Sequence, residues 1–250
     1  MLRKLMIIIP LLVCSYGLVQ AQFVSGKHEI GVNIGALIYQ GDLSPKTIGS
    51  LKTARPTLGI YYNRILTPYW SVRANLNIGS LHGDDARFDE PAYMQHRNFN
   101  FSSRLTELSV LGVYNLYGNN DNLRKFSTYL FAGGGVSFLK IKRDYSRFDT
   151  AFFASDVKLT NGLATDSAAK LPGVIPVLPI GIGVKYAILP RISLVAEGTY
   201  RYTFTDYLDG FSYAANPKLK DSYYSVSIGA VFNFGKDKMA CPTNYKWDRK

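Results

Sequence analysis

The residues best suited to chemistry lie close together in one polar stretch of the sequence, which contains His82, Asp84, Asp85 and His96. Imidazole and carboxylate groups can ligate a metal ion, or can form an Asp–His pair for hydrolysis. Their spacing matches no metal-site or hydrolase signature, and a solvated loop would carry the same residue types. We therefore predict no catalytic residues, no metal site, no cofactor and no enzymatic activity. An enzyme centred on His82 and Asp84 is the third of three alternatives.

A second candidate for chemistry is the run Gly133-Gly134-Gly135. A phosphate-binding loop needs a following helix that carries a Lys-Ser/Thr pair, and neither follows here. Glycine within a strand relieves crowding or marks a bend. Cys241 has no base near it in the sequence to activate its thiol. Neither feature predicts a reaction.

The N-terminus has the features of a secretory signal. Arg3 and Lys4 precede the apolar run from Leu5 to Leu18, and Val19-Gln20-Ala21 offers a small-residue cleavage site. The run is too short for a transmembrane helix, and no later stretch reaches about 18 apolar residues. We predict a signal peptide over residues 1–21 and a mature chain that begins at Gln22. Cys14, which follows Val13, makes a lipoprotein signal the minor alternative.

The composition indicates an exported all-β protein. Aromatic residues make up 14% of the chain, with 18 Tyr and 14 Phe beside 22 Gly. Removal of the signal leaves Cys241 as the single cysteine, so no disulfide can form within the mature chain. The net charge of +11 falls by two to +9 without Arg3 and Lys4. This charge suits anionic lipid headgroups or an acidic partner. No basic-aromatic motif indicates nucleic acid.

Eight segments alternate between apolar and small or polar residues with the period of two that a strand requires. Each has about ten residues, the length that a tilted strand needs to cross a membrane. Aromatic residues stand near the ends of several apolar faces, as at a membrane–water interface. The segments are Glu29 to Tyr39, Thr57 to Leu66, Trp70 to Ser80, Leu105 to Tyr117, Ser127 to Ile141, Val174 to Tyr186, Ile192 to Thr205 and Ser222 to Phe234.

The connections alternate between long and short. Those after the first, third, fifth and seventh segments are long: Gln40 to Pro56, Leu81 to Arg104, Lys142 to Gly173, and Asp206 to Asp221. Outer-membrane barrels have short periplasmic turns and long external loops. We therefore predict an eight-stranded antiparallel up-and-down transmembrane β-barrel over residues 22–234, in the outer membrane of a Gram-negative cell. Strands hidden in the third long connection would raise the number to ten.

The inward faces carry three charges of each sign. We assign Glu29, Glu107 and Glu197 to the lumen together with Arg73, Lys185 and Arg201. Eight strands leave an interior that side chains can just fill. Buried charges need partners. The six residues therefore predict an internal salt-bridge network that plugs the barrel and leaves little room for a channel.

Three stretches carry a family resemblance: GALIYQGDLSP at Gly35 to Pro45, ELSVLGVYNLY at Glu107 to Tyr117, and YRYTFTDYLDGFS at Tyr200 to Ser212. Together they resemble the PorG-like outer-membrane barrel proteins of Bacteroidota, which are associated with type IX secretion. The resemblance implies a structural or adaptor role that connects the outer membrane to periplasmic secretion-ring or lipoprotein components. The most specific family motif is Thr205, Asp206, Tyr207, Leu208 and Asp209. Gly210 stands where the family carries a second acid.

The chain continues past the last strand as a basic tail over residues 235–250. It has more Lys and Arg than Asp, and it includes two aromatic residues. We weigh two interpretations equally, a disordered basic terminus and a short segment that docks onto a partner. The docking interpretation rests on Lys236, Lys238, Tyr245, Lys246, Trp247 and Arg249.

The second functional alternative places function in the external loops. A surface-binding barrel would use these loops to bind a ligand or a host molecule. Aromatic side chains suit such a surface because they supply large contact areas. The loop aromatics that would serve are Phe88, Tyr93, Phe99, Tyr145 and Phe152.

Overall fold

The structure is a computed structural model of the chain, and it describes residues 23–24, 27–45, 48–120, 122–123, 125–215 and 220–235. The predicted signal peptide and the residues of the predicted docking tail lie outside this range. Eight strands form a closed barrel in the order β10-β2-β3-β4-β5-β7-β8-β9. Their bounds are β2 His28–Gln40, β3 Arg55–Ile65, β4 Trp70–Asp84, β5 Asn100–Asn115, β7 Phe126–Asp144, β8 Val174–Leu189, β9 Ile192–Thr203 and β10 Ser222–Phe234.

Every neighbouring pair of barrel strands is antiparallel, and the last strand closes the barrel on the first. Ser222 of β10 pairs with Gln40 of β2, and the register runs without a break to Phe234 and His28. The predicted eight-stranded up-and-down barrel is confirmed. The predicted strands begin and end within a few residues of the observed ones, except where β4, β5 and β7 extend further.

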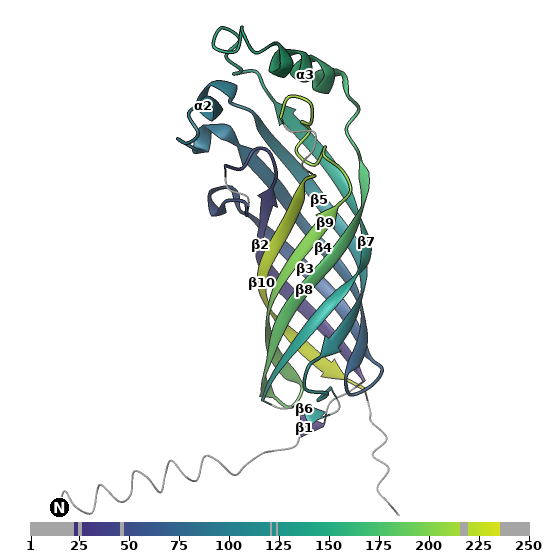
Figure 1. Cartoon of the computed structure of the whole chain (residues 1–250). Coiled ribbons are helices and arrows are strands. Elements are labelled where there is room, and N and C mark those ends of the chain that lie inside the picture. Colours follow the sequence, from purple (N-terminus) through teal and green to yellow (C-terminus); the bar gives the residue numbers. More distant parts are fainter. Residues whose placement is uncertain are drawn as a thin grey trace, which may run out of the picture.

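The two ends of the barrel differ (Figure 1). At one end the connections are short, and β1 (Phe23–Val24) pairs with β6 (Asn122–Leu123) below the barrel. At the other end lie η1 (Leu51–Thr53), η2 (Asp85–Arg87), α2 (Tyr93–Arg97) and α3 (Val157–Ala168). The connection of 142–173 therefore contains a helix, and within the described residues it adds no strand to the barrel. No helix of that described part is long and apolar enough to cross a membrane.

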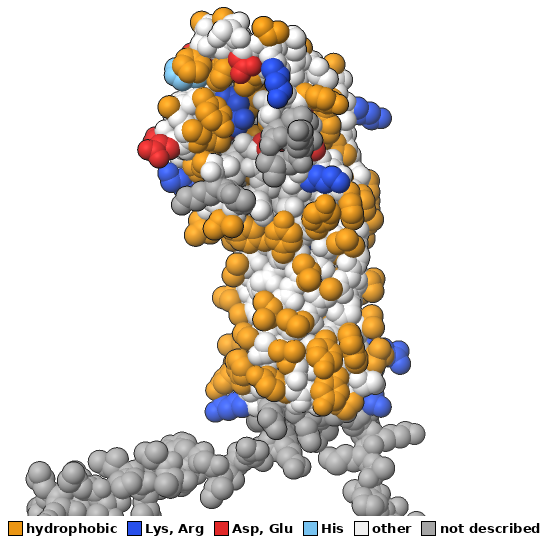
Figure 2. All heavy atoms as spheres, viewed as in Figure 1, with side chains coloured by type: hydrophobic (Ala, Val, Ile, Leu, Met, Phe, Trp, Pro, Cys, Tyr) orange, Lys and Arg blue, Asp and Glu red, His pale blue; other side chains and the backbone are white. Residues whose placement is uncertain are grey.

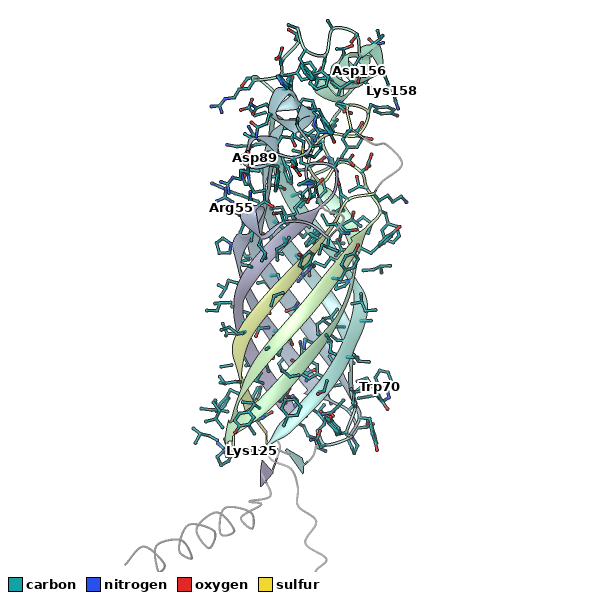
Figure 3. The ribbon with its side chains drawn as sticks, turned by 60° about the vertical axis from the view of Figure 1, so that its left-hand side comes forward. Arg55, Trp70, Asp89, Lys125, Asp156 and Lys158 are labelled. Carbon is teal, nitrogen blue, oxygen red and sulfur yellow. The ribbon has the colours of Figure 1, made fainter. Side chains whose placement is uncertain are left out.

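The outer wall carries an apolar belt between two ends rich in charge (Figure 2). Trp70 and Lys125 lie at the end with the short turns, and Asp156 and Lys158 lie at the opposite end (Figure 3). Phe126 and Phe138 both face outward on β7. At about 3.3 Å per residue and a tilt of about 40°, they are roughly 30 Å apart along the barrel axis. This matches the thickness of the hydrocarbon layer, so the wall is built to span a membrane.

Above this belt the polarity of the two faces of the wall is reversed. β4, β5 and β7 continue upward in register, with Asp84 opposite Asn100 and Asn100 opposite Asp144. Here the inward side chains are apolar, as Leu81 and Phe101 show. The outward residues are polar, because water and not lipid surrounds this part. The sequence analysis placed these segments in loops. Within the membrane the apolar residues of a strand face outward, whereas beyond the membrane they face inward, so the expected alternation is not continued.

Ile38 is a second correction. The period of two put it on the lipid-facing side of the first strand, but its side chain is only 1% exposed. The external segment around Gly49 folds back over it. A covered position at the end of a strand looks the same in the sequence as a lipid-facing one, because both require an apolar residue.

The three consecutive glycines of β7 give a direct test of barrel packing. A methyl group on Gly133 would overlap the carbonyl oxygen of Val110 and lie 2.8 Å from the Cα of Leu111, whereas one on Gly134 meets no atom within 4 Å. We expect Gly133→Ala to lower the free energy of unfolding by about 1–3 kcal/mol. Gly134→Ala, the matched control, should change it by at most about 1 kcal/mol, in the stabilising direction. Urea titrations that separate folded from unfolded barrel by gel mobility would measure both, and equal midpoints would contradict the packing argument.

Candidate functional site

Among the described residues, the barrel interior contains three ion pairs, and each crosses the lumen between strands that are not neighbours. Arg73 Nη1 of β4 lies 2.6 Å from Glu197 Oε1 of β9. Lys185 Nζ of β8 lies 2.7 Å from Glu29 Oε1 of β2. Arg201 Nε of β9 lies 2.6 Å from Glu107 Oε2 of β5. The structure thus brings all six charges that we assigned to the lumen together, as three pairs of opposite sign.

Further hydrogen bonds surround these carboxylates, and those from Tyr129 and Tyr223 reach the same oxygens that the cations contact. Glu197 accepts from the Tyr129 hydroxyl at 2.6 Å and from Asn33 Nδ2 at 2.9 Å. Glu107 accepts from the Tyr223 hydroxyl at 2.9 Å. Tyr129 was missed in the sequence because the triple glycine hid which residues of its strand face inward.

The lumen beside these pairs is filled. The Arg73 guanidinium lies 4.0 Å from the centre of the Tyr61 ring, which closes one side. The space left next to Arg73 and Glu197 is about 10 Å³, and a single water needs at least about that volume. The paired, hydrogen-bonded charges leave little free space beside Arg73 and Glu197. In the residues that the structure describes, the interior is a plug.

We call the end of the barrel that carries η1, η2, α2, α3 and the long connections the external cap. The family motif lies in this cap, just beyond the end of β9 at Thr203. Tyr39 at the top of β2 places its hydroxyl 2.7 Å from Asp209 Oδ2 and 2.7 Å from Asp221 Oδ1. The backbone N–H of Phe211 donates to Asp209, and that of Leu208 donates to Asp221. Burial raises the pKa of Asp209 to about 8, and burial together with the charge of Asp209 raises the pKa of Asp221.

The other motif residues hold the same loop. Thr205 Oγ1 accepts from the N–H of Tyr207, the Tyr207 hydroxyl donates to Asp166, and Asp206 accepts from Ser212. Asp166 of α3 also accepts the backbone N–H groups of Ser212 and Ala214. The motif therefore builds a fixed loop. Asp166, Tyr39 and Asp221 were not predicted, because they are distant in sequence and only the fold brings them together.

Gly210, which replaces the family's second acid, has a structural reason to be glycine. Its φ is +89°, a left-handed conformation that residues with a Cβ rarely adopt. Its carbonyl oxygen accepts a hydrogen bond from Arg143 Nη1 at 2.8 Å.

The external cap has its own apolar core, and this changes the set of aromatics available on its surface. Phe99 stacks on Phe211 with ring centres 4.4 Å apart and is fully buried. Phe88 is also buried, and Tyr145 packs partly buried against the same cluster. Tyr93 and Phe152 remain exposed. Of the five aromatics that we predicted for surface binding, two are therefore internal packing residues and one is half covered.

The His/Asp stretch does not assemble into one site. His82 Nε2 lies 4.0 Å from Asp84, and its Nδ1 contacts the carbonyl oxygen of Phe101 at 2.7 Å. Burial lowers the pKa of His82. Asp85 pairs with Arg97, whereas His96 pairs with Asp149 at 3.1 Å. Within the described residues, no group of three or more His, Cys, Asp or Glu side chains is arranged to hold a metal ion.

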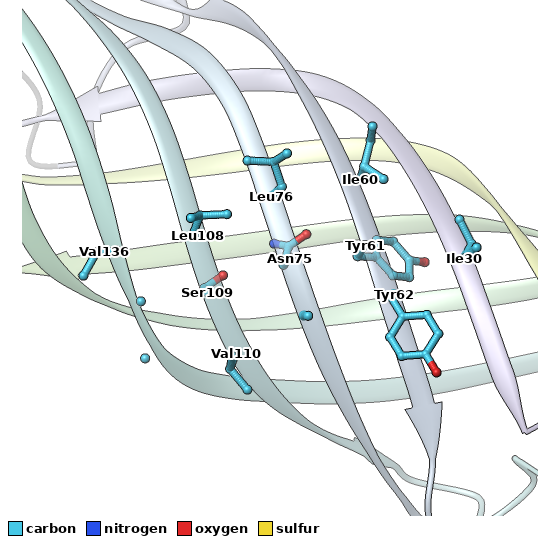
Figure 4. Close-up of a pocket in the computed structure, with 13 residues that line it drawn as sticks. Ile30, Ile60, Tyr61, Tyr62, Asn75, Leu76, Leu108, Ser109, Val110 and Val136 are labelled. Atoms are coloured by element: carbon cyan, nitrogen blue, oxygen red, sulfur yellow. The ribbon is translucent and has the colours of Figure 1, made fainter.

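An apolar hollow lies on the lipid-facing wall (Figure 4). It measures about 540 Å³ and forms where small residues, Ala74 and Gly134, face outward. Its lining contains no carboxylate, imidazole, thiol or amine. It is part of the apolar belt. The hollow is rimmed mainly by Ile60, Tyr62, Leu76, Leu108, Val110 and Val136.

Solved structures of small bacterial barrels are similar to this chain. Neisserial surface protein A (NspA) has a TM-score of 0.46 at 14% identity, over 84% of this chain and 99% of that one. Ail of Yersinia pestis, in complex with the heparin analogue sucrose octasulfate, has a TM-score of 0.45 at 13% identity, over 84% and 99%. OprG of Pseudomonas aeruginosa has a TM-score of 0.45 at 11% identity, over 86% and 99%.

The comparison with curated proteins finds no match. A family model matches residues 3–237, which is nearly the whole chain. The chain belongs to the family described as Domain of unknown function (DUF6089).

Proposed function

We propose that this protein is a non-enzymatic barrel of the Gram-negative outer membrane that acts as a structural adaptor and links that membrane to type IX secretion machinery. The observation that carries the adaptor role is the plugged lumen. With Arg73, Lys185 and Arg201 each paired inside the wall, the interior offers no route for a substrate. Function then belongs to surfaces at the two ends of the barrel.

The periplasmic end is the proposed contact for the secretion machinery. Support comes from the three stretches that resemble PorG-like proteins of Bacteroidota, and from the basic tail that follows Phe234. The β1–β6 sheet lies at the same end of the barrel and adds a second surface for a partner. A ring component or a lipoprotein with an acidic face would suit the positive net charge.

The external cap supports a second candidate, a surface that binds a ligand or a host molecule. Ile48, Leu51 and Val157 are 71%, 77% and 63% exposed on segments outside the membrane belt. Single exposed apolar residues are ordinary on proteins. The surface-binding candidate therefore rests on their strong exposure at the external end, beside a cap whose own core contains Phe99 and Phe211.

Crosslinking in intact cells tests the adaptor role. A tag inserted after the exposed Ser155 allows recovery from the external side, and a variant lacking Lys236 to Lys250 retains Phe234 and the whole barrel. We expect periplasmic secretion components to be recovered with the parent and at least about tenfold less with the truncated variant, if the tail supplies the main contact. Gel mobility of the folded barrel serves as the assembly control.

Three outcomes separate the alternatives. Recovery that survives the truncation moves the contact to the turns and the β1–β6 sheet. If a ligand or host molecule is recovered instead, and its recovery is lost only when the external segment 89–96 is shortened, the surface-binding candidate is supported. If only lipid and unrelated barrels are recovered, the link to secretion is wrong.

A further inference from the structure

Three cations stand together on the outward face of two long strands. Arg104 of β5 and Lys140 of β7 are direct cross-strand partners. Lys142, opposite Ser102, occupies the next outward position on β7. All three side chains are exposed on the outside of the wall. Two positive charges thus face each other directly across the two strands.

Like charges directly opposite each other destabilise a sheet unless an anion lies between them. Within the described residues, no ion pair joins these cations to a carboxylate. Asp144, the next outward residue on β7, hydrogen-bonds to Asn100 and to the N–H of Ser146 instead. The protein therefore leaves the charge of the cluster to be neutralised from outside.

The height of the cluster identifies the source of that anion. Phe138, the outward residue just below Lys140, is still 45% exposed and ends the apolar belt on β7. Two residues of a strand tilted by about 40° rise roughly 5 Å, and four rise roughly 10 Å. The headgroup layer extends about 5–8 Å beyond the hydrocarbon. Arg104 and Lys140 thus lie within that layer, and Lys142 lies slightly beyond it, from where its long side chain can reach back to the headgroups.

We infer that Arg104, Lys140 and Lys142 form a binding site for the phosphate group of a lipid in the outer leaflet. This inference rests on the membrane placement in the proposed function. A guanidinium can hold two phosphate oxygens at once, and the two ammonium groups add point charges beside it. The belt below supplies an apolar wall for the acyl chains of the same lipid. The site holds the barrel at a fixed height in the membrane.

Titration with short-chain lipids tests the site in the full-length mature protein, folded in a nonionic detergent. Dioctanoyl phosphatidic acid is the probe, and native mass spectrometry counts the bound lipids. We expect the double variant Arg104→Gln/Lys140→Gln to bind the phosphatidic acid with an affinity at least about tenfold lower than that of the parent. The matched control Arg147→Gln/Lys158→Gln removes the same charge from exposed positions on the cap and should bind as the parent does. Equal affinity of the first variant and the parent would overturn the site.

The variant Lys140→Glu controls for the possibility that weaker lipid binding results from a loss of folding. It replaces the like-charge pair by an Arg104–Glu pair, so the barrel should be at least as stable as the parent in urea. Its affinity for the phosphatidic acid should nevertheless fall at least as far as that of the double variant. A stable Lys140→Glu variant that keeps parental affinity would show that the cluster does not hold the lipid.

Two further probes identify the source of the phosphate. Dioctanoylglycerol lacks the phosphate and should bind far more weakly than the phosphatidic acid. Inorganic phosphate lacks the acyl chains and should compete only weakly. Equal binding of dioctanoylglycerol, or equal affinity for free phosphate, would overturn the lipid-phosphate site. Because the cluster is at the external end, Arg104→Gln/Lys140→Gln should still recover the periplasmic partners, so this site and the adaptor role can fail separately.

Discussion

Replacing Arg73 with methionine should lower the free energy of unfolding of the barrel by about 3–5 kcal/mol. The reason is the carboxylate that remains. Glu197 is 7% exposed, and its Oε1 lies 2.6 Å from Arg73 Nη1. Without the guanidinium, a negative charge stays buried in the barrel interior without its counter-ion. The hydrogen bonds from Tyr129 and Asn33 cannot replace the lost opposite charge.

The double variant Arg73→Met/Glu197→Gln is the control that separates charge from packing. The glutamine oxygen can still accept the hydrogen bond from the Tyr129 hydroxyl, and no unpaired charge remains. Because replacing both members of a buried ion pair is often close to neutral, we expect this variant to regain at least half of the lost stability. Urea unfolding of the barrel in lipid vesicles, followed by tryptophan fluorescence, measures all three proteins. A double variant as unstable as Arg73→Met would mean that shape, and not charge pairing, dominates the plug.

The interior and the belt could be predicted because each strand carries its own information. Arg73 stands between Val72 and Ala74, so the period of two assigns it to the lumen without knowledge of any other strand. Matching three acids with three bases then indicates a network. The partner of each charge was not predictable, because Arg73 and Glu197 pair across the lumen and their distance depends on the tilt and stagger of the whole barrel.

The external cap was harder to predict for a physical reason. Outside the membrane the apolar side of a strand faces inward, so Leu81 and Phe101 follow the opposite rule from Leu76 and Leu108. A single alternation pattern cannot show where the surroundings change from lipid to water. Contacts such as that of Tyr39 with Asp209 depend on loops that fold back over the barrel mouth. No local spacing encodes them.

The contact of Tyr39 with Asp209 makes the stability of the cap depend on pH between about 4 and 8. The Tyr39 hydroxyl has one proton, yet it lies 2.7 Å from a carboxylate oxygen of Asp209 and 2.7 Å from one of Asp221. It can donate to only one of them, so the other contact requires a protonated carboxyl that donates to the tyrosine oxygen. Asp42 and Asp206 face the pair and favour its protonation, whereas Arg97 of α2 is the cation near Asp209. The folded cap therefore holds a proton that the unfolded segment releases at about pH 4.

The sign of the pH dependence follows from this extra proton. Between the unfolded pKa of about 3.9 and the folded pKa of Asp209 of about 8, the folded cap binds more protons than the unfolded one. Its stability must then fall as pH rises through this window, by roughly 1.4 kcal/mol per pH unit for one proton, and level off above it. Hydrogen exchange at the N–H groups of Leu208 and Phe211, corrected for intrinsic rates, should show weaker protection at pH 8 than at pH 6.

Asp209→Asn decides whether this proton is the cause. An asparagine has the shape of the protonated acid: its oxygen can accept from the Phe211 N–H, and its amide can donate to the Tyr39 oxygen, which frees the tyrosine proton for Asp221. The variant should keep its protection nearly constant from pH 6 to pH 8, and at pH 8 it should exceed the parent. Amides of the barrel wall serve as the internal reference, since their protection should not follow the cap. If the parent and Asp209→Asn lose protection in parallel, the shared proton is not what holds the loop in place.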